Sequence, residues 1–70
     1  MAGAGIFHCS TSYKDILSSF KVAKSLYPDF TVNVLDLNNV DDRMRAVDID
    51  PDVADLQGYC VTIEVPEKLY

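Results

Sequence analysis

The sequence predicts a small α/β protein, in which residues 1–70 form a single domain with the order strand, helix, strand, helix, strand. Between residues 6 and 37, apolar residues recur every second residue, then every three or four, then every second again, as in a strand–helix–strand unit. A further helical pattern and a further alternating run follow. Because such units form right-handed crossovers between parallel strands, we expect a three-stranded sheet whose first two strands are parallel.

The first two elements are a short apolar strand over residues 5–9 and a helix over residues 12–27. Ser12 and Asp15 have the spacing of a helix cap, in which the hydroxyl accepts a hydrogen bond from the amide three residues on. Pro28 ends the helix, because proline disfavours helical angles at the residue before it. Apolar residues at offsets of three and four form one stripe, which we expect to be buried. The stripe consists of Tyr13, Ile16, Leu17, Phe20, Ala23, Leu26 and Tyr27.

The second strand covers residues 30–37 and changes phase along its length. Val32 and Val34 belong to one face, whereas Leu35 and Leu37 belong to the other. A run that is apolar on both faces suits a central or parallel strand, or one that contains a bulge.

Two short helical segments are predicted next. Asn38 and Asn39 are favourable caps for a helix over residues 40–47, in which the apolar residues again recur at offsets of four and three. Asp50 as N-cap, followed by Pro51, predicts one or two more helical turns, which stop at Gly58.

The last strand covers residues 59–65 and alternates strictly between apolar and more polar residues. We therefore expect one buried face, formed by Tyr59, Val61, Ile63 and Val65, and one solvated face. Pro66 ends the strand, and residues 67–70 are expected to form a loose tail. Three strands and short helices leave an edge or a face of the sheet poorly covered, which favours a homodimer, a bound partner or a place in a larger assembly.

Charge is distributed unevenly along the chain. The net charge is −5, and residues 36–70 carry nine acidic side chains against three basic ones. Such an acidic half repels phosphate backbones, so we expect no direct binding to nucleic acid. It attracts basic protein surfaces and speeds encounter with them. The predicted contact residues are Asp41, Asp42, Asp48, Asp50, Asp52 and Asp55.

No metal site, cofactor or membrane partner is predicted. The series Asp48, Asp50, Asp52 resembles the start of a calcium loop, but Val53 and Tyr59 stand where that loop needs Gly and Glu. No run approaches the ~18 apolar residues of a membrane span, and the first residues do not resemble a signal peptide. We therefore expect a soluble cytoplasmic protein. Two cysteines are too few for a disulfide framework or a structural zinc site.

Cys9 is the one candidate for catalysis. It follows the first strand and forms a Cys-x-x-Ser motif with Ser12. Over residues 6–47 the chain resembles the thioredoxin superfamily and its single-thiol glutaredoxins, which carry this motif between the first strand and first helix. The resemblance implies a reactive thiol at Cys9, with Ser12 in place of the resolving cysteine. The chain departs from the family in that Pro66 follows the third strand and no fourth strand or last helix is predicted.

Two structural questions bear on Cys9. The sequence leaves open whether Ser12 or Cys9 caps the first helix, and only the second choice places the thiol at the helix dipole. In parallel neighbouring strands, Cys9 and Cys60 would lie roughly 15 Å apart, so we expect no disulfide. Only an antiparallel arrangement could bring them together. His8 should point to the opposite face from Cys9 and so cannot serve as its base.

The function that the sequence favours is a small acidic, non-enzymatic interaction module. It would act as an adaptor or inhibitor, and in size and charge it is like small phage and bacterial inhibitors. Its acidic half would bind a basic surface of a larger partner protein. The alternative is a truncated thioredoxin-like monothiol redox protein that uses Cys9.

Overall fold

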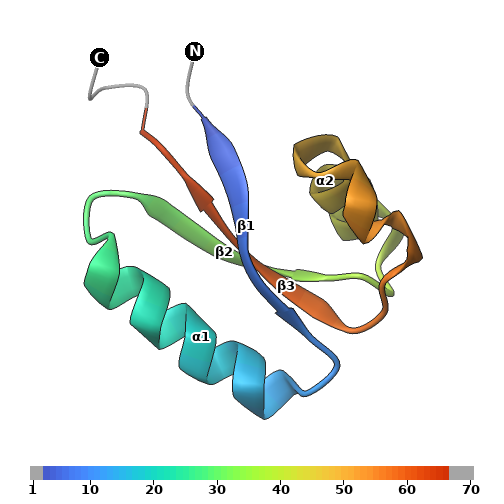
Figure 1. Cartoon of the computed structure of the whole chain (residues 1–70), viewed down its shortest axis with the longest axis horizontal. Helices are drawn as coiled ribbons and strands as arrows, with labels where there is room; N and C mark the ends of the chain where they lie inside the picture. Colours follow the sequence, from blue (N-terminus) through green and yellow to red (C-terminus); the bar gives the residue numbers. More distant parts are fainter. Residues whose placement is uncertain (1–2, 67–70) are drawn as a thin grey trace.

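The computed structural model of the chain describes residues 3–66, so the predicted tail at 67–70 lies outside the described residues. Its element order matches the prediction. The elements are β1 (Ala4–Ser10), α1 (Tyr13–Leu26), β2 (Thr31–Asp36), α2 (Val40–Ile49), the 3-10 helix η1 (Pro51–Asp55) and β3 (Tyr59–Glu64). In Figure 1, α1 runs along the sheet, whereas α2 and η1 gather at one end of it.

The predicted parallel pairing of the first two strands is wrong. The strand order is β1-β3-β2, and β3 lies antiparallel to both of its neighbours. A helical crossover does not require that the strands it joins be adjacent. Here α1 carries the chain across a gap one strand wide, and the last strand fills that gap.

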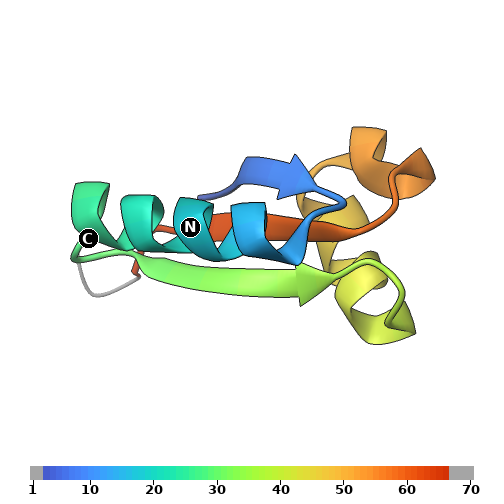
Figure 2. The ribbon, with the colours of Figure 1, turned by 90° about the horizontal axis from the view of Figure 1, so that it is seen from below.

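Helices cover the two faces of the sheet, and each face has its own apolar cluster. Under α1 the buried residues are Ile16, Ala23, Val32 and Val61. On the α2 side they are Leu35, Leu37, Ala46, Val53 and Cys60. Figure 2 shows α1 lying along the strands, whereas α2 and η1 lie toward one end of the sheet. The phase change within residues 30–37 follows from this arrangement, since β2 contributes Val32 to one cluster and Leu35 to the other.

The expectation of one wet face on the last strand is wrong. Tyr59, Val61 and Ile63 do pack on the α1 side, as predicted. However, Cys60 and Thr62 on the other face are 0% and 1% exposed. A central strand has neighbours on both sides, so even the face without full helical cover is shielded by side chains of β1 and β2.

An irregularity in β1 changes which face its residues occupy. Ile6 pairs with Thr62 and His8 pairs with Val61, so β1 has one extra residue at this point. Such a bulge shifts the alternation by one. Phe7 therefore packs in the α1 cluster, whereas Ile6 and Cys9 both pack in the α2 cluster.

Ser12 caps α1, which answers the question that the sequence left open. Its hydroxyl accepts a hydrogen bond from the Asp15 amide over 3.3 Å. Of the predicted apolar stripe, Ile16 and Ala23 are fully buried, whereas residues at the flanks of the stripe are exposed. The prediction therefore gave the correct side of α1 as the one that faces the sheet. The predicted stripe is wider than the part of the helix surface that the sheet covers.

Gly58 has a different role from the predicted helix stop. The 3-10 helix already ends at Asp55, and Gly58 has φ +97°, which favours glycine. A Cβ atom here would lie 2.5 Å from the Ser10 carbonyl oxygen. Glycine thus allows the segment before β3 to pass close to the end of β1.

Candidate interaction surface

The α2–η1 lobe, residues 40–55, carries the six predicted contact aspartates. Its first helix begins as expected, because the Asn39 side chain accepts a hydrogen bond from the Asp42 amide over 3.1 Å. The Asp42 carboxylate in turn accepts a hydrogen bond from the Asp36 amide over 3.1 Å. Asp42 thereby joins the start of α2 to the end of β2, and it is half-buried.

The second part of the lobe begins at Asp50. The Asp50 carboxylate accepts a hydrogen bond from the Asp52 amide over 3.1 Å, and Pro51 occupies the first helical position. The predicted N-cap is therefore present, although the turn it starts is 3-10 rather than α. The carboxylates of Asp50 and Asp42 therefore both accept hydrogen bonds from backbone amides of the chain itself.

Arg43 holds the lobe together, and sequence reasoning missed it. Its Nε donates a hydrogen bond to the Leu37 carbonyl over 2.8 Å, and its terminal nitrogens donate to the carbonyls of Ala54 and Leu56. The planar guanidinium carries donors on three nitrogens, so it can reach carbonyls that lie farther apart than the single ammonium nitrogen of lysine can reach. One side chain thus connects the end of β2, α2 and the end of η1. No local pattern marks it, because its acceptors are backbone groups 6 to 13 residues away.

The other four predicted contact residues point to solvent. Asp41, Asp48, Asp52 and Asp55 are all exposed, and none forms an ion pair with another residue of 3–66. Exposed carboxylates that form no ion pair remain able to attract basic groups of another molecule. The structure therefore divides the predicted set into two structural aspartates and four that are free to meet a partner.

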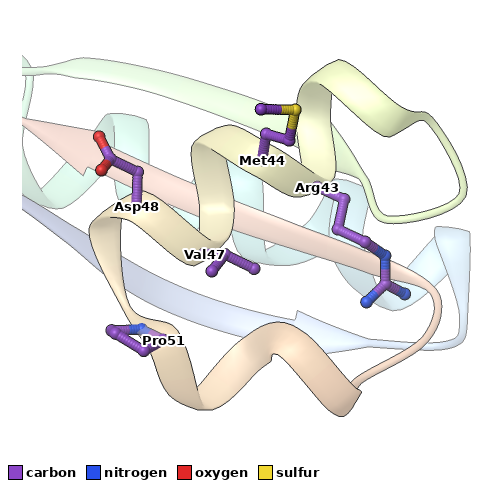
Figure 3. Close-up of a pocket in the computed structure, with 5 residues that line it drawn as sticks. All are labelled: Arg43, Met44, Val47, Asp48 and Pro51. Atoms are coloured by element: carbon purple, nitrogen blue, oxygen red, sulfur yellow. The ribbon is translucent and has the colours of Figure 1, made fainter.

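An open hollow of about 500 Å³ lies between α2 and η1. It is lined by Arg43, Met44, Val47, Asp48 and Pro51, which Figure 3 shows along α2 and at the start of η1. Met44 is 66% exposed and Val40, one turn earlier, is 72% exposed. The apolar repeat used to predict this helix therefore faces outward, and Ala46 is buried in its place.

The Cys9–Cys60 disulfide is present, so the expectation that these cysteines stay apart is wrong. They are directly opposite each other in the antiparallel β1–β3 register, with their Cα atoms 4.2 Å apart. This is the spacing of a pair without backbone hydrogen bonds, where side chains come closest. The antiparallel pairing of β3 removes the separation that parallel strands would have imposed.

Cys9 and Ser12 are not brought together as a thiol site. Cys9 is bonded to Cys60, and the Ser12 hydroxyl is used as the α1 cap. His8 points to the α1 side, away from the disulfide, and its Nε2 lies 2.8 Å from an Asp15 carboxylate oxygen. His8, followed by Ser10, lowers the pKa of Asp15 from its ordinary value. No observation within residues 3–66 therefore favours monothiol chemistry at Cys9.

Two further findings limit the candidate sites. Within the described part of the chain, no three His, Cys, Asp or Glu side chains come together in a way that could hold a metal ion. None of the helices in residues 3–66 has the length and hydropathy needed to cross a bilayer.

Comparison with known proteins adds no family: no protein-family model, curated protein or solved structure matches this chain. The case for a function therefore depends on the surface just described.

Proposed function

We propose that the chain is a small acidic, non-enzymatic interaction module that binds a larger protein through the α2–η1 lobe, as an adaptor or inhibitor. The observation that supports it is the set of four exposed aspartates on this lobe, without ion-pair partners in the described residues. Capping hydrogen bonds and the Arg43 contacts hold the backbone beneath them. A partner therefore meets charges at fixed positions and does not have to order them.

The basic side chains of the first half lie elsewhere. Lys14, Lys21 and Lys24 are exposed on α1, which packs on the other face of the sheet. Negative charge therefore predominates on the α2–η1 lobe, which has six aspartates against Arg43 and Arg45, and positive charge on α1, which has three lysines against Asp15. A partner with a basic surface is attracted to the α2–η1 lobe and not to α1, which orients the encounter as well as speeding it.

The compartment of this module stays a prediction. A cytoplasmic location keeps cysteines reduced, whereas a disulfide persists in oxidising compartments. The Cys9–Cys60 bond gives a direct test. Alkylation of free thiols at the moment of lysis should label both cysteines if the protein is cytoplasmic, and neither if its compartment is oxidising.

The binding function is tested with a charge-neutral variant. Asp41, Asp48, Asp52 and Asp55 are changed together to Asn, and the lysines of α1 are changed to Gln in a control variant. Partners captured by the wild-type chain from the cells that express it are identified and purified. Their affinity is then measured by calorimetry at ~0.05 and ~0.5 M salt, across which exposed charges become strongly screened.

The wild-type affinity should fall at least about tenfold at the higher salt, and the aspartate variant should bind weakly at both, since screening removes the same attraction. The lysine control should bind as well as the wild type. An affinity that is independent of salt and unchanged in the aspartate variant would show that the acidic lobe is not the binding surface.

A further inference from the structure

The outward face of α2 carries an apolar strip, and residues 3–66 leave most of the Val40 and Met44 side chains in it uncovered. It consists of Val40, Met44 and Val47, at offsets of four and three, and continues to Pro51 at a further offset of four. Val40 and Met44 are among the most exposed apolar side chains in the described residues. Alternating offsets of four and three are the spacing of the contact positions in a two-stranded coiled coil. The strip therefore has the form of one half of a helix–helix contact.

The hollow beside this strip is a depression that side chains of another molecule can enter. Met44 and Val47 line it from α2, and Pro51 lines it from η1 (Figure 3). Val47 is half-buried and also packs against the core cluster beneath α2, so the hollow has a fixed apolar wall. Because it is open to solvent, a side chain of another molecule can enter from the side without a rearrangement of α2.

The charges nearest the strip on one flank are the carboxylates of Asp41 and Asp48, and the exposed Arg45 lies farther round the helix from the strip. Asp41 follows Val40 and Asp48 follows Val47, so the two aspartates lie two turns apart, about 10 Å along the axis. Both are exposed, and Asp48 also lines the hollow. On the opposite flank, the Arg43 guanidinium is occupied by three backbone carbonyls. A helix laid on the strip therefore meets a row of carboxylates beside its apolar contacts.

We propose that the α2 strip is the docking surface for an amphipathic helix of the partner, with apolar residues over Met44 and Val47 and with Lys or Arg facing Asp41 and Asp48. This inference rests on the proposed function, and it specifies the part of the lobe that makes contact and the form of the partner. Charge complementarity selects this occupant. A second copy of the chain would bring together two lobes that each carry six aspartates against two arginines.

A synthetic peptide provides the probe. It is a helical peptide of about four turns, with Leu at the contact positions and Lys at the flanking positions. It is titrated into the ¹⁵N-labelled full chain, and amide shift changes are followed by NMR. A second peptide has the same composition in scrambled order, so it keeps the charge and loses the apolar face. In a third peptide Glu replaces each Lys.

Two matched variants test the strip. Met44→Gln replaces an exposed apolar side chain on α2, and Leu26→Gln replaces one of similar exposure, 62%, on α1. Both sites are solvent-facing and glutamine is a good helix former, so both variants should fold. We expect the Lys peptide to shift amides of residues 40–50. Met44→Gln should weaken binding by about tenfold, which corresponds to ~1.4 kcal/mol, and Leu26→Gln should leave it unchanged.

The alternative outcomes separate this inference from the proposed function. If the scrambled peptide binds equally well and Met44→Gln has no effect, the apolar strip is not the docking surface. The proposed binding through the acidic lobe would not be contradicted by that result. If the Glu peptide binds as well as the Lys peptide, the partner helix does not need basic residues facing Asp41 and Asp48. That result would contradict the proposed function as well. A dimer in analytical ultracentrifugation that Met44→Gln dissociates would assign the strip to a second copy and overturn the proposal.

Discussion

In α1 the residues at the centre of the apolar stripe, Ile16 and Ala23, are fully buried against the sheet. In α2 the corresponding residues, Val40 and Met44, face solvent. Helix α1 is therefore held by its apolar face. Helix α2 is held by the small side chain of Ala46, which permits close approach to the sheet, and by the hydrogen bonds of Arg43. Of the α2 stripe, only Val47 packs against the core, so Val40 and Met44 stay free to contact another molecule.

The largest expected effect concerns the disulfide, which lies on the α2 side of the sheet. A bond across 51 residues contributes about 4 kcal/mol in the chain-entropy model. For a 70-residue domain this is comparable to the whole free energy of unfolding. The Cys9→Ser/Cys60→Ser double variant should lose most of its resistance to urea. In hydrogen exchange, amides of residues 40–55 should lose protection before those of α1.

Equal loss of protection in α1 and in the α2–η1 lobe would show that the two faces of the sheet unfold as one unit. The urea titration of the reduced wild-type chain serves as a control, because it should behave like the double variant.

The two helices are compared directly by truncating one residue of each stripe. Ile16→Ala should lower the free energy of unfolding by about 2–5 kcal/mol, because it leaves a cavity between α1 and the sheet. Met44→Ala should change it by less than about 0.5 kcal/mol, since the side chain is already solvated. Chemical denaturation of both variants with the disulfide intact measures the difference. A cost at Met44 similar to that at Ile16 would mean that the α2 stripe is part of the core.

Arg43 should be more important to α2 than any apolar residue on its outer face. Arg43→Gln should lower the free energy of unfolding by about 2 kcal/mol, because carbonyls at the end of β2 and η1 lose a charged donor. Arg43→Lys keeps the charge but loses the branched geometry, and it should recover less than half of that loss. Denaturant midpoints give the energies. Full recovery by lysine would indicate that charge alone matters.

The smallest expected effect is at the start of α1, where His8 contacts Asp15. The pKa of Asp15 is lowered in the folded state, so its contribution to stability is present above the unfolded value of ~3.9 and is lost as pH falls through the folded value. Asp15→Asn should therefore remove a small part of the stability loss below about pH 4. Urea midpoints of the wild type and the variant, compared between pH 5 and pH 2, measure this difference. His8→Gln should reproduce most of it, because His8 is the main cause of the shift.

Local patterns predicted the elements and their ends with good accuracy. Ser12, Asn39 and Asp50 act as N-caps in the structure as they do in the sequence pattern, because capping involves only residues two or three positions apart. These features depend on contacts within a single turn, and one sequence contains all the residues that make them.

The sequence by itself determined the element order, the helix caps and the concentration of aspartates in the second half. Tertiary structure decided the rest. The insertion of β3 between β1 and β2 made both hydrogen-bonded strand pairs antiparallel and placed Cys9 opposite Cys60. The irregularity in β1 and the turning of the α2 stripe toward solvent likewise depend on which segments meet in space. Contacts between residues far apart in the chain decide which strands pair and which side of a helix is buried. A periodic pattern within one segment does not indicate which other segments will pack against it.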